Sequence, residues 1–178
     1  MSSKTAKGPN SCYISQGQHA VGFAQGDVIS TILGSCVATC LWDPIARIGG
    51  MNHFLLPDGS AEDGSVTRYG ANAMEMLINA MIRQGGDRRN FRAKVFGGAN
   101  LRAGLTDAGQ QNAAFVIDYL NRENIPCDGQ SLGGTQARRV EFMAEEGRAR
   151  QKLVADQAVK ETKVIVAPVE DVSGLELF

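Results

Sequence analysis

Two apolar runs with a turn between them constrain the fold of this chain more than any other feature. Residues 37–42 and 48–56 are predominantly apolar, and Asp43-Pro44 stands between them. Runs of this kind are typical of strands buried on both faces, whereas a half-exposed strand alternates apolar and polar side chains. We therefore predict that the two runs pair as neighbouring strands at the centre of the core.

The remaining periodicity predicts further strands and two helices. Apolar residues recur at helical spacing over residues 69–83 and 108–123, so each segment is expected to pack one face on a sheet. Further strands are predicted at four segments: residues 28–33, 93–96, 138–143 and 148–154. The alternation in 138–143 indicates an edge strand. The fold class is therefore α+β, a single layered domain of mixed β-sheet with two main helices.

The chain length and the composition of its ends define one domain with two tails. A chain of 178 residues can bury roughly 70% of the surface of its unfolded state, enough for one core. Residues 1–11 are polar and are expected to be disordered, and residues 12–154 are expected to form the domain. Residues 155–178 form a second flexible tail with an apolar end, which could dock on a partner.

Charge and hydropathy exclude several function classes. The 18 Lys and Arg residues nearly balance the 19 Asp and Glu residues, so nucleic acid is not an expected partner. No apolar run approaches the roughly 20 residues that cross a bilayer, and the N-terminus lacks the apolar stretch of a signal peptide. We expect a cytoplasmic protein without membrane insertion, in which the four cysteines are reduced thiols.

Cys36 and His53 are the candidate catalytic pair. Cys36 follows a permissive Gly34-Ser35 bend, and His53 lies in the neighbouring apolar run, so strand pairing would bring thiol and imidazole together. The imidazole would maintain a thiolate, which a free thiol with a pKa of about 8.5 does not form readily at neutral pH. A hydroxyl from Ser30 or Thr31 could orient the imidazole, and strand alternation favours Ser30.

The candidate substrate and oxyanion residues surround this pair. The backbone around Gly34 and Ser35 offers N–H donors for an oxyanion, and Asn52 stands directly before His53. Gly97 and Gly98 follow a predicted strand and are expected to line the site, because the turn lacks the further residues of a phosphate-binding loop.

Three other interpretations compete with a catalytic pair. Cys36 and His53 could be two ordinary core residues. Cys36, Cys40 and His53 could bind a metal, but a structural zinc site usually has four ligands in two tight pairs, so we predict no metal site. The chain could also be a non-catalytic module that binds proteins through its tail and loops.

The motifs of the chain are similar to those of a known family. Residues 12–154 resemble the chemoreceptor glutamine deamidase family, CheD. The resemblance rests on a series of segments in the same order: Leu33-Gly34-Ser35-Cys36-Val37-Ala38, Trp42-Asp43-Pro44, Gly50-Met51-Asn52-His53-Phe54-Leu55-Leu56-Pro57, Arg68-Tyr69, Phe96-Gly97-Gly98-Ala99, Asn112, Leu132-Gly133-Gly134 and Arg138-Arg139.

The resemblance implies a function and roles for individual residues. It implies hydrolysis of glutamine side-chain amides to glutamate on methyl-accepting chemotaxis receptors, with Cys36 as nucleophile and His53 as base. This reaction needs no cofactor, so we expect none. The family's orienting residue is a threonine six positions before the cysteine, where this chain has Ser30 with Thr31 beside it. The implied fold is that of the deamidase domain of cytotoxic necrotising toxins. Some family members bind a CheC-type phosphatase, which is therefore a second expected partner beside the receptors.

Overall fold

The strands of the protein divide between two mixed sheets. The computed structural model describes residues 10–57, 64–102 and 107–155. The first sheet has the order β1-β3-β8-β9, with β1 parallel to β3 and the other neighbours antiparallel. Its strands are β1 (Ser11–Tyr13), β3 (Val28–Leu33), β8 (Ala137–Met143) and β9 (Arg148–Val154).

The second sheet contains the two apolar runs at its centre. Its order is β2-β5-β4-β6-β7, with β6 parallel to β7 and the other neighbours antiparallel. Its strands are β2 (His19–Gly22), β4 (Val37–Asp43), β5 (Ile48–Asn52), β6 (Arg92–Gly97) and β7 (Cys127–Leu132). The pairing of β4 with β5 confirms the prediction made from the Asp43-Pro44 turn.

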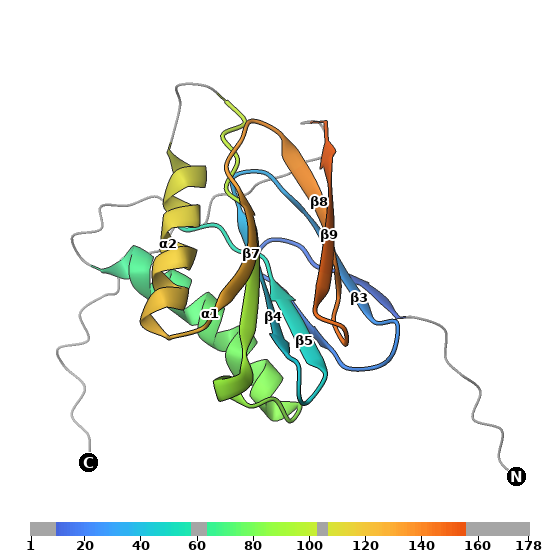
Figure 1. Ribbon diagram of the computed structural model, residues 1–178. Helices are drawn as coiled ribbons and strands as arrows, with labels where there is room; N and C mark the ends of the chain where they lie inside the picture. The colour runs from blue at the N-terminus through green and yellow to red at the C-terminus, as the bar shows by residue number, and fades with distance from the viewer. Residues whose placement is uncertain (1–9, 58–63, 103–106, 156–178) are drawn as a thin grey trace, which may run out of the picture.

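Two helices cover the outer face of the second sheet, so the domain has three layers (Figure 1). Helix α1 (Ser65–Arg83) contacts β5 and β2, and α2 (Ala108–Arg122) contacts β4 and β6. A 3-10 turn, η2 (Arg88–Asn90), precedes β6. The predicted α+β class with two main helices is confirmed, with the strands arranged as two sheets.

Side chains alternate between two cores because the second sheet lies between the helices and the first sheet. Val37 and Leu41 on β4 pack against the helices, whereas Ala38 and Cys40 face the first sheet. Both faces of the second sheet are thus buried, which explains the continuous apolar runs.

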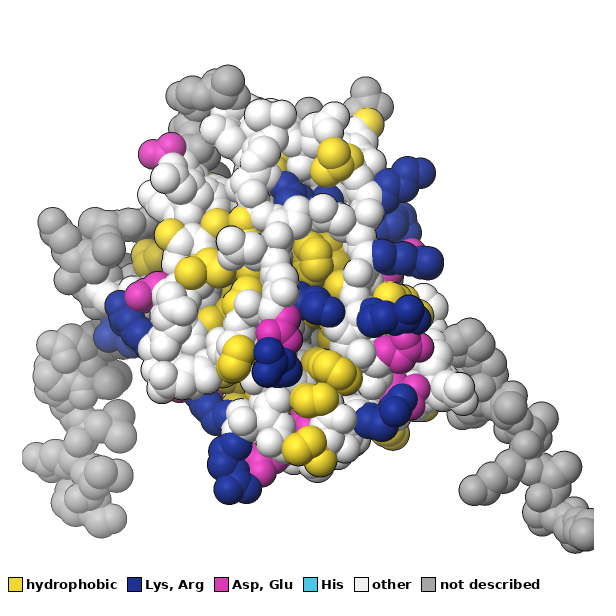
Figure 2. Space-filling model, viewed as in Figure 1, with side chains coloured by type: hydrophobic (Ala, Val, Ile, Leu, Met, Phe, Trp, Pro, Cys, Tyr) yellow, Lys and Arg dark blue, Asp and Glu magenta, His cyan; other side chains and the backbone are white. Residues whose placement is uncertain are grey.

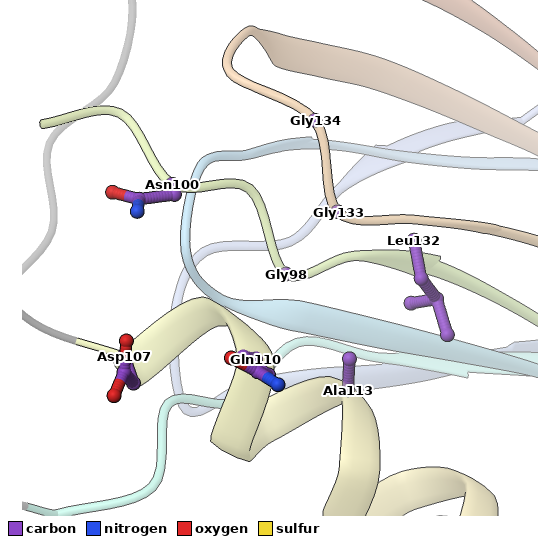
Figure 3. A pocket seen from close by; sticks show the side chains of 8 residues that line it. All are labelled: Gly98, Asn100, Asp107, Gln110, Ala113, Leu132, Gly133 and Gly134. Carbon is purple, nitrogen blue, oxygen red and sulfur yellow. The ribbon is translucent and has the colours of Figure 1, made fainter. Parts of the chain in front are cut away.

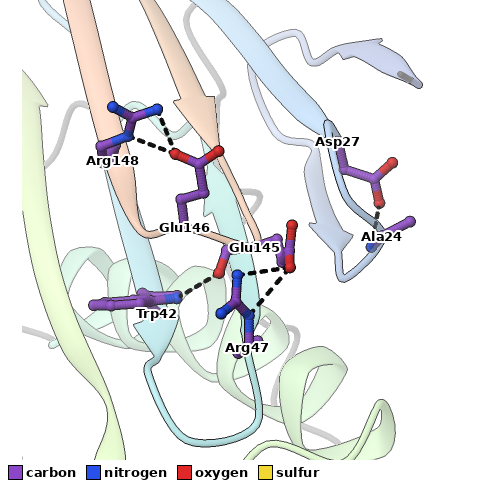
Figure 4. Close-up of polar contacts among 7 residues, drawn as sticks. All are labelled: Ala24, Asp27, Trp42, Arg47, Glu145, Glu146 and Arg148. Atoms are coloured by element: carbon purple, nitrogen blue, oxygen red, sulfur yellow. Dashed lines mark hydrogen bonds and ion pairs between the residues drawn. The ribbon is translucent and has the colours of Figure 1, made fainter. Parts of the chain in front are cut away.

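The β8–β9 hairpin is tied to the turn between β4 and β5. The Trp42 indole N–H donates to the Glu145 carbonyl at 3.2 Å, and Arg47 forms an ion pair with Glu145 at 2.7 Å (Figure 4). A side chain on Gly147 would collide with the Trp42 ring, so only glycine fits at this φ of 67°. These contacts hold the two sheets together at the end away from Cys36.

One strand position and two boundaries differ from the sequence prediction. β8 lies between β3 and β9, so it is an interior strand and not an edge strand. Helix α1 begins at Ser65, four residues before the expected start. β1 begins at Ser11, inside the predicted N-terminal tail. Residues 1–9 and 156–178, which hold nearly all of both predicted tails, lie outside the described residues. None of the helices described is both long and apolar enough to span a membrane.

Candidate active site

Strand register places Cys36 and His53 on one face of the second sheet. Cys40 pairs with Met51, and in the same register Val37 bonds Phe54 through both backbone N–H groups, at 3.0 and 2.9 Å. Cys36 and His53 each precede a member of the Val37–Phe54 pair by one residue, so both side chains project toward the first sheet. Diagonal neighbours of this kind lie within reach of each other's side chains.

Thr31 on β3 connects the first sheet to His53. Its hydroxyl lies 2.7 Å from Nδ1 of His53 and donates to the Ile14 carbonyl, also at 2.7 Å. A hydroxyl has one proton, and a carbonyl can only accept. The Thr31 oxygen must therefore accept from Nδ1–H, which leaves Nε2 of His53 without a proton and able to take one.

The structure corrects the preference for Ser30 as the orienting residue. Ile29 and Leu33 pack between the sheets, and Thr31 shares their parity on β3, whereas Ser30 points to the opposite face. Strand alternation along β3 does not continue to Cys36, because the Gly34-Ser35 bend lies between them. The bend interrupts the strand, so the parity of Cys36 is not that of an unbroken extension of β3.

Burial keeps the His53 imidazole neutral. Only 6% of His53 is exposed, and loss of solvation lowers its pKa from 6.5 to about 4. At neutral pH the ring is therefore an acceptor at Nε2 and a donor at Nδ1. Cys36 is fully buried among apolar side chains between the sheets.

Three consecutive carbonyls of the Cys36 bend are held from one side. The Gly34 carbonyl accepts from Ala99 N–H at 2.9 Å and the Cys36 carbonyl from Gly98 N–H at 2.8 Å. The Ser35 carbonyl accepts from the side-chain amide of Asn112 at 2.8 Å. Because C=O and N–H point in opposite directions across a trans peptide, these bonds orient the N–H groups of Ser35 and Cys36 away from Asn112 and its neighbours.

Gly97 and Gly98 support the bend, which differs from the predicted lining role at the oxyanion. The Gly98 N–H is already bonded to the Cys36 carbonyl. A Cβ on Gly97, whose φ is 113°, would collide with that same carbonyl oxygen. A Cβ on Gly98, whose φ is 64°, would lie 2.7 Å from the Gly109 carbonyl oxygen, so both glycines are needed for close backbone approach.

The Asn52 side chain connects β5 to β4 and α1. Its side-chain oxygen accepts from Thr39 N–H at 2.9 Å, and its amide nitrogen contacts the Ala73 carbonyl and the Met74 sulfur on α1, both at 3.4 Å. Asn52 points toward the helices, opposite to His53 on the next residue. The expectation that it contacts an oxyanion beside Cys36 is therefore wrong.

Asn112 is a site residue to which sequence reasoning assigned no role. It is 1% exposed, and besides holding Ser35 it accepts from Leu56 N–H at 2.9 Å. It thus joins the Cys36 bend to the segment that follows His53. The signal was present in the sequence, since Asn112 shares the apolar face of α2 with Val116 and Leu120.

Two cavities lie near this arrangement. One of about 210 Å³ lies beside His53 and is lined by the segment before β2 and by α1, including Tyr69 and Met76. Another of about 340 Å³ lies behind the bend, between the start of α2 and the Gly133-Gly134 turn (Figure 3). Gly98 lines the second cavity, but Cys36 and His53 do not.

The alternative metal site finds no support in the geometry. Within residues 10–57, 64–102 and 107–155, no three His, Cys, Asp or Glu side chains come together as a metal site would need. Cys40 is buried opposite Met51, and burial raises the pKa of its thiol. It fills the core beside the catalytic candidates.

Comparison with known proteins identifies the family. A family model described as CheD chemotactic sensory transduction matches residues 55–153. The chain is 49% identical over 172 residues to a protein from Caulobacter sp. (strain K31) named "Probable chemoreceptor glutamine deamidase CheD", covering 93% of this chain and 92% of that one. The chain belongs to the CheD family.

Further relatives with the same name have similar identity to this chain. A protein of the same name from Acidiphilium cryptum is 53% identical over 146 residues, covering 80% of this chain and 77% of the relative. Another from Cereibacter sphaeroides is 46% identical over 147 residues, covering 83% and 74%. Among solved structures, the Bacillus licheniformis hypothetical protein YfiH aligns with a TM-score of 0.42 and 13% identity, covering 66% of this chain and 51% of that one.

Proposed function

We propose that this CheD-family protein hydrolyses the side-chain amides of selected glutamines on chemoreceptors, with Cys36 as nucleophile and His53 as base. The names of the relatives support the substrate class. The observation that carries the mechanism is the Thr31 hydrogen bond to Nδ1, because it leaves Nε2 of His53 as a proton acceptor on the face that Cys36 shares.

In the first half-reaction, Nε2 of His53 takes the thiol proton and the Cys36 sulfur attacks the carboxamide carbon. The C=O π electrons move onto the oxygen, whose negative charge requires N–H donors. When the tetrahedral intermediate collapses, ammonia leaves with a proton from Nε2–H and a thioester remains. The N–H groups of Ser35 and Cys36 are the proposed backbone donors, because the bend is held from its carbonyl side.

In the second half-reaction, the neutral imidazole takes a proton from water, which attacks the thioester carbon. Collapse of the second intermediate releases glutamate, and the sulfur regains its proton from Nε2–H. Because burial lowers the pKa of His53, the imidazole is neutral at the start of each half-reaction of this cycle.

The proposed reaction implies where the protein acts and which partners it meets. Its receptors would present their cytoplasmic regions, so we propose a cytoplasmic location. A CheC-type phosphatase remains a proposed partner, to be tested by co-purification with the full-length chain.

Mass spectrometry of a receptor cytoplasmic fragment tests the proposal. The wild-type protein should add about one dalton at specific glutamines, the change on amide hydrolysis, and Cys36→Ala and His53→Gln should not. Cys127→Ala is the matched thiol control, because Cys127 is exposed on β7. An unmodified fragment, or equal modification by Cys36→Ala, would exclude the mechanism and favour a binding module.

A further inference from the structure

One short segment contacts all three members of the triad Cys36, His53 and Thr31. In residues 14–18, between β1 and β2, the Ile14 carbonyl accepts from the Thr31 hydroxyl. The His53 backbone is bonded on both sides, by Gly17 N–H at 2.7 Å and by the Gln18 carbonyl at 3.0 Å. The side-chain oxygen of Gln16 lies 3.9 Å from the Cys36 sulfur.

The backbone of this segment forms a defined turn. Gln18 N–H donates to the Ser15 carbonyl at 3.0 Å, and the Gln18 side chain accepts from Ser15 N–H at 2.9 Å. Gly17 has a φ of 85°, as the third residue of a type II turn requires. Gln16 is the second residue of the turn, and the bonds to His53 fix the turn on the triad.

We propose that Gln16 is a further catalytic residue, whose side-chain N–H stabilises the oxyanion during attack by Cys36. This inference rests on the proposed glutamine hydrolysis. The Gln16 amide reaches the reacting sulfur, and the sulfur lies among apolar side chains where a polar donor has a large effect.

The amide can serve both stages of the reaction. Before attack its oxygen accepts from the thiol S–H, which is the observed contact. After the thiol proton has moved to His53, negative charge lies first on sulfur and then on the substrate oxygen. Rotation about the last side-chain bond then presents the NH₂ group in place of the oxygen, with no movement of the turn.

Two substitutions separate this role from a packing role. Gln16→Met keeps the length of the side chain but removes both N–H donors, and Gln16→Glu keeps the shape while leaving only acceptors. Gln130→Met and Gln130→Glu are matched controls, because Gln130 is exposed on the edge strand β7. Thermal unfolding of all four variants checks that the fold is retained.

The experiment compares deamidation with alkylation of the same thiol. Iodoacetamide reacts with the Cys36 thiolate without forming an oxyanion, and peptide mapping resolves Cys36 from the other cysteines. For Gln16→Met we expect kcat on a receptor fragment to fall about 10²–10³-fold, as for the loss of one oxyanion donor, while the alkylation rate of Cys36 stays within about threefold. For Gln16→Glu we expect the same loss of kcat, together with slower alkylation, because the carboxylate opposes thiolate formation.

Other outcomes would overturn the role of Gln16. If wild type is active and Gln16→Met keeps kcat within about threefold, Gln16 is not a donor. If the rate of Cys36 alkylation in Gln16→Met falls in parallel with kcat, Gln16 acts on the thiol and not on the oxyanion. A Cys36-dependent gain of about one dalton at Gln16 would make it an internal substrate. An inactive wild-type protein would instead refute the underlying glutamine hydrolysis, and with it the role of Gln16.

Discussion

The Thr31 hydroxyl lies 2.7 Å from Nδ1 of His53 and bridges it to the Ile14 carbonyl on the other side. This bridge joins the two sheets at the triad, because Thr31 belongs to β3 and His53 directly follows β5. It sets both the orientation and the tautomer of the imidazole, so its removal should affect proton transfer more than folding.

The first prediction concerns Thr31 and its neighbour. Thr31→Val keeps the shape of the side chain but removes the acceptor for Nδ1–H, so the tautomer with a bare Nε2 loses its support. We expect kcat for deamidation of a receptor fragment to fall by about 10²–10⁴-fold, in the range seen when an imidazole loses its orienting partner. Steady-state kinetics by mass spectrometry measure the change.

Two variants serve as controls for this prediction. Thr31→Ser retains the hydroxyl and should keep most of the activity. Ser30→Ala changes a residue of opposite parity and should alter kcat by no more than about threefold. A large loss in Ser30→Ala with normal activity in Thr31→Val would restore Ser30 as the orienting residue.

The contrast between Ser30 and Thr31 shows how far the sequence alone could lead. Apolar runs identified β4 and β5, and the turn between them identified the pairing that places Cys36 near His53. Local alternation is reliable within a strand, and it places Thr31 with Ile29 and Leu33 on the inner face of β3. It could not be extended through the bend, whose geometry depends on Gly97, Gly98 and Asn112, all distant in the sequence.

The polar residues around the site were harder to assign for a similar reason. Asn52 and Asn112 are both buried amides, and residue type alone does not separate a brace from a substrate contact. Each amide bonds to backbone groups that need a side-chain partner, such as Thr39 N–H, which donates to Asn52. Which backbone groups need such a partner depends on tertiary contacts. The apolar face of α2 could have indicated that Asn112 is buried, but not that it holds Ser35.

The second prediction concerns Asn112 as a positioning residue. Asn112→Asp keeps an oxygen for Leu56 N–H but replaces the donor to the Ser35 carbonyl with a second oxygen. The bend that carries Cys36 should shift, and we expect kcat to fall about 10²-fold with KM little changed, as for a misplacement of about 1 Å. Kinetics of deamidation test this, with Asn121→Asp as the control because Asn121 is exposed on the same helix.

A second measurement separates positioning from general destabilisation. Asn112→Asp should also lower the rate of Cys36 alkylation at a low temperature, at which circular dichroism shows that the variant is folded. A variant that regains normal kinetics once it is folded would show that Asn112 contributes only to stability.

The third prediction concerns the titration of His53. Burial lowers its pKa to about 4, below the ordinary value of 6.5, so the unfolded chain binds more protons than the folded chain between these values. Stability should therefore fall by about 3 kcal/mol from this group as the pH drops from 6.5 to 4, and the loss should be complete below 4. The imidazole signal of His53 in NMR spectra should show a midpoint near 4.

The imidazole signal of His53 can be assigned with one substitution. It contains two histidines, so His19→Gln leaves His53 as the only imidazole. In denaturation experiments His53→Gln should remove its share of the pH dependence between 4 and 6.5. A midpoint near 6.5 for His53 would contradict the lowering of its pKa by burial.

The fourth prediction concerns Asp43, the last residue of β4 before the turn to β5. Its carboxylate is fully buried and accepts from the N–H groups of Ile45, Ala46 and Asp87, at 2.8 to 2.9 Å. Burial alone would raise the pKa of Asp43, but the hydrogen bonds from these backbone groups outweigh it and hold the pKa below its ordinary value. Asp43→Ala should therefore lower the free energy of unfolding at pH 7 by about 2–4 kcal/mol, measured in urea.

The pH dependence distinguishes the charge of Asp43 from its shape. A carboxylate with a lowered pKa in the folded state stabilises fully above the pKa of the unfolded chain, and this contribution is lost as the pH falls through the folded value. The difference between wild type and Asp43→Asn should therefore be largest at neutral pH and should shrink below pH 4. Asp118→Asn, an exposed carboxylate on α2, should show a much smaller difference at pH 7. If Asp43→Asn is as stable as wild type at pH 7, the ionised carboxylate does not stabilise this turn.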